Sequence, residues 1–471
     1  MNIKTTKLGR MGALVTALTL ASVGAATAAS ADNTKGFDLP DKSQPVSLTI
    51  HKHEGDSQQL GEYTGQKPSG LGNPVKGVEF TIQKVGTMVD GSCVAPDLAT
   101  PKSWVAIKSA TVDNVCDLNK TTQKVETEEN GSVKVDHLEQ GLYKVTETDS
   151  GPNVVATKSV PFLVTLPMPL PSNKWDYDVH AYPKNKLVEN PGKDLKKDAG
   201  KPDKPVPGAS IDWTIKVTLP GVALPYTEIS LTDTIPAGLQ FSQVKSFMVD
   251  NTELIKGEDF TNDATIKLTK KGLEKVNKLV VGNDKAGKTF HVSVVLQTKV
   301  TEEITGKVEN KVTLSLNGKT TEASGATFWG TVEVKKIDEN GQTITSPAKF
   351  AIFEGQCKNV TSSTEPVAKE LKTINGKISQ TLYVGKSEAD TAHYCVKETA
   401  APAGYLLDNS GEDIELSASG WNVDIEYKNV KVTGPNLPLT GAQGTALLTG
   451  VGLLLLTAGA GTVYVVRRRD V

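Results

Sequence analysis

Hydrophobic and polar residues alternate over short runs along most of the chain, and few stretches show a sustained helical period. Side chains on a β-strand point alternately to opposite faces, so this pattern predicts half-buried strands. Gly, Asn and Asp clusters separate the runs, as is typical of β-sandwiches. We expect one or two short helices in the segment 254–278. Clear alternating runs are Val46–Ile50, Val78–Ile82, Ile211–Val217 and Val332–Val334.

Two segments repeat the same order of features, which indicates one module used twice. The first contains Leu48–Lys52, Gly77–Phe80 and Gly141–Thr148; the second contains Val332–Asp338, Ala348–Phe350 and His393–Tyr405. The segment between them shares neither the opening nor the close. Pro, Lys and Gly concentrate in 190–208 at the first boundary, and Gly325–Gly330 lies near the second. The chain is too long for one core, so we predict three all-β, Ig-like domains: 32–185, 186–328 and 329–434.

The N-terminus has the three parts of a secretory signal peptide. Lys4, Lys7 and Arg10 form a basic start, and an apolar stretch follows from 11 to about 23. Small residues at Ala29-Ser30-Ala31 predict cleavage before Asp32, with Ala26-Thr27-Ala28 as a second candidate site. We therefore predict export by the Sec pathway and assign residues 1–31 to the signal; the alternative is an N-terminal membrane anchor.

The C-terminal segment, 435–471, combines a pentapeptide, an apolar stretch and a basic end. The stretch 442–466 is long enough to span a bilayer as a helix, and Arg467, Arg468 and Arg469 would keep its end in the cytoplasm. The bulk of the chain then lies outside the cell. An ordinary membrane anchor would show these two features alone. The pentapeptide before them is Leu437-Pro438-Leu439-Thr440-Gly441.

This pentapeptide resembles the LPxTG sorting signal of Gram-positive surface proteins at all four fixed positions. The resemblance implies that a sortase cysteine cuts between Thr440 and Gly441. It also implies that the Thr440 carbonyl is then held as a thioester until an amine attacks it. The predicted location is therefore the cell surface and cell wall, after a membrane-tethered stage.

Composition narrows the classes of function. The net charge is −2 and no basic face stands out, so we expect no nucleic-acid partner. The four cysteines fall as local pairs within predicted domains, and in an exported chain this favours disulfides Cys93–Cys116 and Cys357–Cys395. Zinc is the alternative, although no CxxC motif or closely spaced histidine accompanies them.

The segment Trp175-Asp176-Tyr177-Asp178-Val179-His180-Ala181-Tyr182-Pro183-Lys184-Asn185 resembles the pilin motif of backbone pilins of Gram-positive pili. The flanking modules resemble prealbumin-like B-type domains of collagen-binding proteins. The resemblance implies that Lys184 attacks the sortase thioester of another copy and is joined to its Thr440 carbonyl. It also implies as partners a pilus-specific sortase, further copies of the chain, minor tip and base pilins, and peptidoglycan through the housekeeping sortase.

Members of this family form Lys–Asn isopeptide bonds inside domains, assisted by a buried acid. Burial disfavours charge, so the lysine becomes a neutral nucleophile and the acid can move protons. In domain three the resemblance assigns Lys336, Glu398 and Asn429 to these roles. In domain two it assigns Asp233 as the acid and Asn310 as the acceptor. Lys193 fits best as the lysine there, with Lys196 and Lys197 competing.

Domain one departs from the family pattern, because its Glu147 segment lacks the APxGY ending of domain three. Lys52 and Glu147 lie where a bond could form, and Asn185 is the available acceptor. We expect the domain to remain without a cross-link, and leave the bond as the alternative.

No HExxH, GxSxG or P-loop motif is present, so we expect no turnover enzyme, no cofactor and no metal. His51 and His53 share a strand face, but two ligands are too few for a metal site and we expect a solvated edge. Three functions are compatible with an exported, anchored chain: a pilus shaft subunit, a monomeric wall-anchored adhesin and an anchored surface enzyme. Lys184 in its motif favours the shaft subunit, because a monomeric adhesin needs no acceptor lysine.

Overall fold

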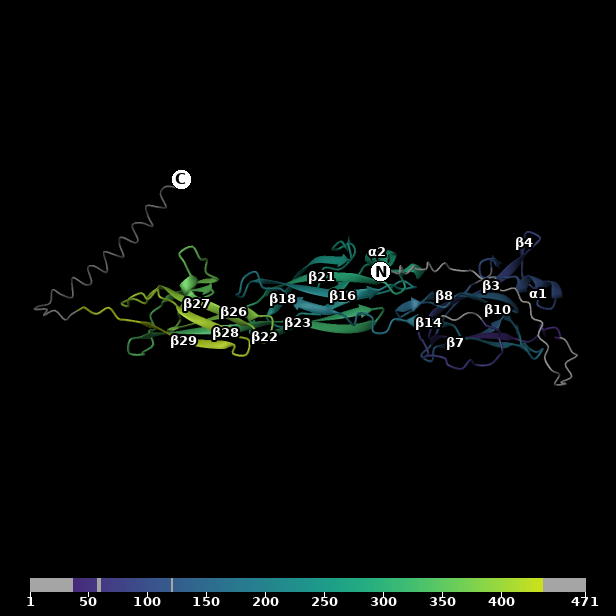
Figure 1. The fold of residues 1–471 in the computed structure, drawn as a ribbon, viewed down its shortest axis with the longest axis horizontal. Helices are drawn as coiled ribbons and strands as arrows, with labels where there is room; N and C mark the ends of the chain where they lie inside the picture. Colours follow the sequence, from purple (N-terminus) through teal and green to yellow (C-terminus); the bar gives the residue numbers. More distant parts are fainter. Residues whose placement is uncertain (1–36, 57–60, 120–121, 435–471) are drawn as a thin grey trace, which may run out of the picture.

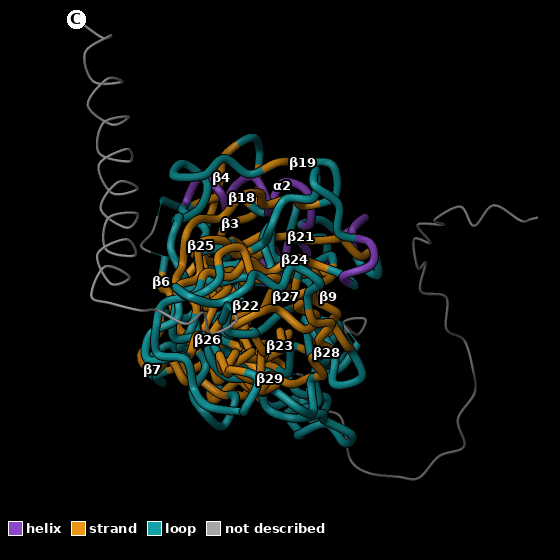
Figure 2. The backbone as a smooth tube through the Cα atoms, turned by 90° about the vertical axis from the view of Figure 1, so that its left-hand side faces the viewer, coloured by secondary structure: helices purple, strands orange, loops and turns teal. Residues whose placement is uncertain are grey.

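The computed structural model describes residues 37–56, 61–119 and 122–434, which form three β-sandwich units lying end to end (Figure 1). Each unit has its own apolar core, which includes Phe80 in the first, Trp213 in the second and Phe350 in the third. Viewed along the long axis, the strands of the three units overlap in projection, so the molecule is a rod (Figure 2). The predicted all-β fold is confirmed.

Both predicted targeting segments, the signal peptide and the sorting tail with Leu437–Gly441, lie outside the described residues. Within the described ranges, no helix has the length and apolar character needed to cross a bilayer.

Strands that alternate apolar and polar residues in the sequence also alternate buried and more exposed side chains in the structure. In β16 (Ser210–Pro220), Ile211, Trp213, Ile215, Val217 and Leu219 are buried and the residues between them face outward or are half-buried. Such a strand buries one face against the opposite sheet and leaves the other toward solvent, as expected for a sandwich.

Domain one contains four small sheets. Their orders are β13-β1-β7, β10-β8-β3-β4 with β5 and β6 also on β3, β11-β12, and β2-β14-β9. The elements are β1 (Val46–His51), β2 (His53–Glu54), β3 (Glu79–Val89), β4 (Ser92–Val94), α1 (Pro101–Lys108), β5 (Cys116–Asp117), β6 (Gln123–Glu126), β7 (Ser132–Leu138), β8 (Gly141–Asp149), β9 (Val155–Thr157), β10 (Phe162–Leu166), β11 (Met168–Pro169), β12 (Trp175–Asp176), β13 (Asp178–Ala181) and β14 (Lys184–Leu187).

Domain two packs the sheet β15-β16-β21-β18-β19 against the sheet that contains β17, β20 and β22. Its elements are β15 (Lys196–Ala199), β16, β17 (Ile229–Thr234), β18 (Leu239–Val249), β19 (Thr252–Glu253), β20 (Thr265–Lys267), α2 (Lys270–Val280), the 3-10 turn η1 (Asn283–Lys285), β21 (Thr289–Val300), β22 (Gly306–Leu316) and β23 (Lys319–Asp338).

The helix expected within 254–278 is α2, which begins and ends later than the pattern indicated. Thr269 caps it by accepting a hydrogen bond from the Gly272 amide at 3.2 Å. Gly272, Val276 and Val280 repeat every four residues and form its buried face.

Domain three shares a strand with domain two. Its own elements are β24 (Lys349–Glu354), the 3-10 turn η2 (Cys357–Asn359), β25 (Ala368–Lys372), β26 (Lys377–Gly385), β27 (Thr391–Ala400), β28 (Glu412–Ser417) and β29 (Asn422–Asn429). One sheet has the order β25-β24-β27-β28, and the other places β23 between β26 and the parallel strand β29.

The predicted boundary at 328–329 lies inside β23. The first half of this strand pairs with β22 of domain two, and the second half pairs with β26 and β29 of domain three. Trp329 is fully buried at the crossover, and its ring meets Tyr383 edge-on at 5.3 Å. Domains two and three are therefore joined by a continuous strand and a shared aromatic contact.

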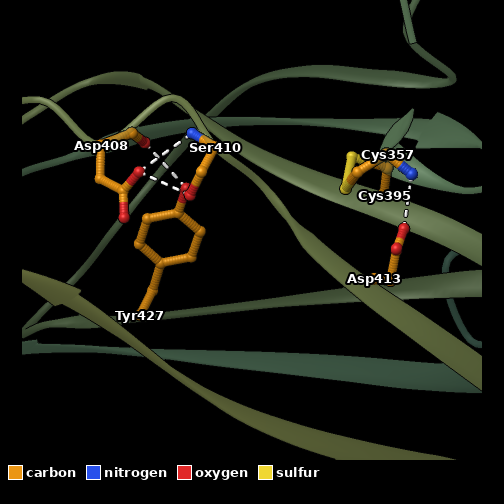
Figure 3. The surroundings of a disulfide bond; sticks show 6 residues. All are labelled: Cys357, Cys395, Asp408, Ser410, Asp413 and Tyr427. Atoms are coloured by element: carbon orange, nitrogen blue, oxygen red, sulfur yellow. Dashed lines mark hydrogen bonds between the residues drawn. A yellow bond between two sulfur atoms is a disulfide. The ribbon is translucent and has the colours of Figure 1, made fainter. Parts of the chain in front are cut away.

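Both predicted disulfides are present, which removes the zinc alternative. Cys93–Cys116 closes the excursion that carries β4, α1 and β5, and Cys357–Cys395 ties η2 to β27. Beside the second disulfide, the Cys357 amide donates to Asp413 Oδ1 at 2.5 Å (Figure 3). The same picture shows the Tyr427 hydroxyl, which donates to the Asp408 carbonyl at 2.8 Å.

Replacing Trp329 by Ala should destabilise the junction and uncouple domains two and three. Loss of a fully buried Trp typically costs about 3–5 kcal/mol of unfolding free energy. Calorimetry should show a lowered transition in Trp329→Ala, split from that of the neighbouring domain. Val105→Ala, at an exposed site of α1, is the control. An unchanged single transition in Trp329→Ala would show that the junction does not depend on this residue.

Candidate functional site

A buried lysine, carboxyl and amide meet in domain one. Lys52 follows β1, Glu147 lies on β8 and Asn185 lies on β14, and all three side chains are excluded from solvent. Lys52 Nζ donates to Glu147 Oε2 at 2.8 Å and to Asn185 Oδ1 at 2.6 Å. Asn185 Nδ2 donates to Glu147 Oε1 at 2.6 Å. The carboxyl group therefore contacts both nitrogens, one with each oxygen.

Strand pairing explains how residues so distant in sequence meet. β1 pairs in parallel with β13, and β2 pairs in parallel with β14, with Glu54 opposite Asn185. The chain thus enters and leaves domain one on neighbouring strands, which places Lys52 beside Asn185. The sequence favoured a domain without a cross-link, and the structure instead assembles the alternative set of residues.

Ser159 joins this cluster and was missed from the sequence. It lies between β9 and β10, and its backbone amide donates to Asn185 Oδ1 at 2.7 Å. Its hydroxyl donates to Glu147 Oε2 at 2.7 Å and accepts from Lys52 Nζ at 3.0 Å. The residue sits in an irregular segment with no motif around it, so no sequence signal pointed to it.

Domain two contains an equivalent cluster, but its lysine is not Lys193, the residue that fitted best from the sequence. Lys197 forms a buried ion pair with Asp233 on β17, whereas Lys193 and Lys196 are exposed. β15 alternates between exposed and buried positions, and this alternation turns Lys197 inward while Lys193 lies in the preceding turn. Lys193 is therefore the wrong choice as the partner of Asp233.

Asn310 completes this second cluster. It is fully buried on β22 opposite Gly325, and it opposes the rise in the pKa of the nearby Asp233 carboxyl. Within the described residues, neither its Nδ2 nor its Oδ1 has a hydrogen-bond partner. A side chain at 325 would come within 2.7 Å of the Lys197 carbonyl oxygen. Gly325 thus allows β15 to pass close over the strand that faces Asn310.

Domain three holds the set that the sequence assigned. Lys336 on β23, Glu398 on β27 and Asn429 on β29 are all buried. Lys336 Nζ lies 3.5 Å from Glu398 Oε1 and donates to the Tyr427 carbonyl at 2.8 Å. Asn429 Nδ2 donates to Glu398 Oε2 at 2.7 Å and also to the Leu406 carbonyl. Parallel pairing of β23 with β29 again brings the lysine and asparagine strands side by side.

Burial changes the acid–base chemistry of these groups. It lowers the pKa of Lys52 to about 8 and that of Lys197 to about 8, against opposing effects of Glu147 and Asp233. It also lowers the pKa of Lys336 and raises that of Asp233. An aromatic ring lies beside each ammonium: Phe80, Trp213 and Tyr427, at 5.4, 5.2 and 4.8 Å respectively. Such apolar surroundings favour a neutral amine.

Lys184 has a different environment at the start of β14. Its side chain is half-buried, its stem passes over Gly55, and its Nζ lies 3.5 Å from the Gly70 carbonyl. A groove of about 390 Å³ has this lysine in its lining. The groove is lined by parts of 61–68, by 159–164 with the exception of Pro161, by Met168 and by Val179–Lys184.

The two histidines noted in the sequence do not act as a pair. His51 stacks on Tyr182, and its Nε2 lies 2.8 Å from Nδ1 of His180. His53 is held separately, with Nδ1 at 2.8 Å from the Gly72 carbonyl. Both are half-buried, so the expected solvated edge was wrong.

Known families match three parts of the chain. Residues 43–186 match the Gram-positive pilin subunit D1, N-terminal domain; residues 330–431 match the prealbumin-like fold domain; and residues 429–471 match the LPXTG cell wall anchor motif. The chain is a wall-anchored Gram-positive pilin. Its place is the cell surface, and it belongs to a structural class of protein, not to an enzyme family.

Similar proteins span the length of this pilin. Fimbrial subunit type 2 of Actinomyces naeslundii is 28% identical over 100% of this chain and 98% of its own. Fimbrial subunit type 1 of Actinomyces viscosus is 28% identical over 97% of each chain. Among solved structures, the full-length major pilin SpaD of Corynebacterium diphtheriae aligns at 25% identity over 84% of this chain and 99% of that one, with a TM-score of 0.43.

Proposed function

We propose that this pilin is the shaft subunit of a covalent pilus, polymerised by a pilus-specific sortase. The observation that carries the proposal is Lys184, a half-buried lysine in the lining of a groove, in a chain that also has an LPxTG signal. The sortase cysteine would hold the Thr440 carbonyl of one copy as a thioester. The Lys184 amine of another copy attacks that carbonyl, an isopeptide bond forms, and the cysteine thiol leaves.

The groove supports this role because its lining combines Lys184 with apolar and aromatic surface that an incoming chain can contact. Tyr63, Phe162, Leu163 and Tyr182 are among the residues that line it. An ordinary lysine is almost wholly protonated at pH 7, so the sortase must take up a proton when the amine attacks the thioester. Only the last subunit, or a separate base pilin, would then be joined to peptidoglycan by the housekeeping sortase.

We also propose that each domain forms one internal Lys–Asn bond: Lys52–Asn185, Lys197–Asn310 and Lys336–Asn429. Transfer of one proton from the lysine to the carboxyl converts the buried ion pair into a neutral amine and a neutral acid. The amine attacks the asparagine carbonyl carbon, and the acid protonates the leaving amide nitrogen. The resulting carboxylate takes one proton from the attacking nitrogen, the carbon–nitrogen bond of the amide breaks, and ammonia departs. The charge of the buried lysine is removed permanently, and this makes the bond strongly favourable.

The polymer assignment can be tested by expressing the full chain with its sortase and boiling the wall extract in SDS. The wild type should give a ladder of high-mass species, and Lys184→Ala should give monomer alone. Lys186→Ala, at an exposed lysine two residues along the same strand, should retain the ladder. A ladder that persists in Lys184→Ala would exclude Lys184 as the acceptor, and the absence of any ladder from wild type would favour a monomeric adhesin.

Intact mass of the ectodomain, residues 32–434, should show the loss of three ammonia molecules after allowance for two disulfides. Lys197→Ala should reduce this loss by one, because its amine faces Asp233 in the buried site. Lys193→Ala should leave all three losses intact, because that lysine is exposed. If Lys193→Ala reduced the loss by one ammonia and Lys197→Ala did not, Lys193 would be the reactive lysine of domain two.

The reaction of domain two should have a bell-shaped dependence on pH. The reactive pair carries one proton in total, as neutral Lys197 and protonated Asp233. Loss of that proton should slow the reaction above about pH 8, the lowered pKa of Lys197. A second proton, bound at low pH, converts Lys197 to ammonium and also slows it. Refolding of unreacted ectodomain across pH 5–10, followed by peptide mass, measures this; tryptophan fluorescence at each pH checks folding. A rate that climbs steadily to pH 10 would contradict the shared-proton mechanism.

A further inference from the structure

Ser159 contacts all three reactive side chains of domain one, and it does so with two different groups. Its backbone amide points at the oxygen of the asparagine amide that would be attacked. Its hydroxyl contacts both the attacking nitrogen of Lys52 and the carboxyl of Glu147, which also contact each other at 2.8 Å. The residue is 6% exposed, so water does not compete freely for these contacts.

We propose that Ser159 is a catalytic residue of bond formation in domain one. Its backbone amide stabilises the developing oxyanion on Asn185, and its hydroxyl carries a proton between Lys52 and Glu147. The inference rests on the proposed Lys52–Asn185 bond and adds a fourth participant to it.

The steps balance in atoms and protons. The neutral Lys52 amine attacks Cγ of Asn185, and Oδ1 becomes an oxyanion facing the Ser159 amide. Glu147 Oε1 gives its proton to Nδ2, while Oε2 receives a proton from the new ammonium through the Ser159 hydroxyl. The Cγ–Nδ2 bond breaks, the carbonyl reforms and ammonia leaves. Glu147 ends protonated, as it began, and Ser159 is unchanged.

Geometry supports an oxyanion role for the amide. A donor at 2.7 Å from the carbonyl oxygen lies within the range found in oxyanion sites, where one donor contributes about 10²–10³ in rate. The other two domains lack such a donor: across residues 122–434, neither Asn310 Oδ1 nor Asn429 Oδ1 has a hydrogen-bond partner. Domain one therefore has an additional device at its reactive carbonyl.

The hydroxyl lies on a continuous path of hydrogen bonds. Lys52 Nζ, Ser159 Oγ and Glu147 Oε2 are linked at 3.0 and 2.7 Å, and Glu147 Oε1 reaches Asn185 Nδ2 at 2.6 Å. A proton can thus pass from the attacking to the leaving nitrogen without entering solvent. A serine with a purely structural role would need to donate a hydrogen bond only to the Glu147 carboxylate.

The test follows bond formation in the refolding ectodomain, residues 32–434, by the ratio of cross-linked to linear peptides containing Lys52 and Asn185. Ser159→Ala, which keeps the amide, should slow this bond about tenfold or more. Ser159→Thr, which keeps the hydroxyl, should restore most of the rate. Ser159→Pro, which lacks both donors, should be the slowest. Ser150→Ala, at another buried serine of the domain, should leave the rate unchanged.

The bonds of domains two and three form in the same molecules and provide the folding control. Slowing confined to domain one, with recovery in Ser159→Thr, supports the proposal. Equal slowing of all three bonds in Ser159→Ala, or a wild-type rate in that variant, overturns it. If wild type forms the bonds of domains two and three but never Lys52–Asn185, both this proposal and the proposed domain-one bond fail. If no domain forms a bond, the proposed internal chemistry fails as a whole.

Discussion

Each domain of this pilin is organised around one buried lysine. Removing an ammonium from solvent costs several kcal/mol unless it is paired and hydrogen-bonded. Lys52, Lys197 and Lys336 each meet this cost with one carboxyl group from a strand of another sheet. The pairing reduces the penalty without removing it, because burial still lowers the pKa of all three lysines. A reaction that replaces the charge by a neutral amide removes the remaining cost.

The same residues that bear this cost also connect the ends of each domain. Parallel pairs carry the lysine and asparagine segments in domains one and three, β2–β14 and β23–β29. Parallel neighbours require long connections, and a cross-link that closes a long loop is expected to stabilise a fold more than one that closes a short loop. In domain two the approach is different: β15 crosses close to the strand opposite Asn310 at Gly325, which has no side chain to obstruct it.

The sequence predicted the fold, the disulfides and the cluster of domain three, because alternation and cysteine spacing are local and the resemblance supplied the rest. It failed where the answer depended on non-local pairing. Lys197 could have been chosen from the alternation of Leu195, Lys197 and Ala199, all of which turn inward. Asn185 was named only as the acceptor of a bond that the sequence did not favour, because its position beside Lys52 depends on strands more than a hundred residues apart. Ser159 has no signal at all, because it lies in an irregular segment with no motif around it.

In the proposed polymer, tension enters the subunit at Lys184 and leaves at Thr440. The bonds Lys197–Asn310 and Lys336–Asn429 lie between these points, so they would divert force past most of domain two and of domain three. β23 joins these two bonds as one continuous strand. Domain one precedes Lys184 and lies outside this path, so its bond cannot serve the same purpose. Asn185 is the next residue after Lys184, and fixing it to Lys52 fixes the backbone that presents the polymerising amine. The proposed bond of domain one would therefore fix the position of Lys184, whereas the other two proposed bonds would strengthen the shaft.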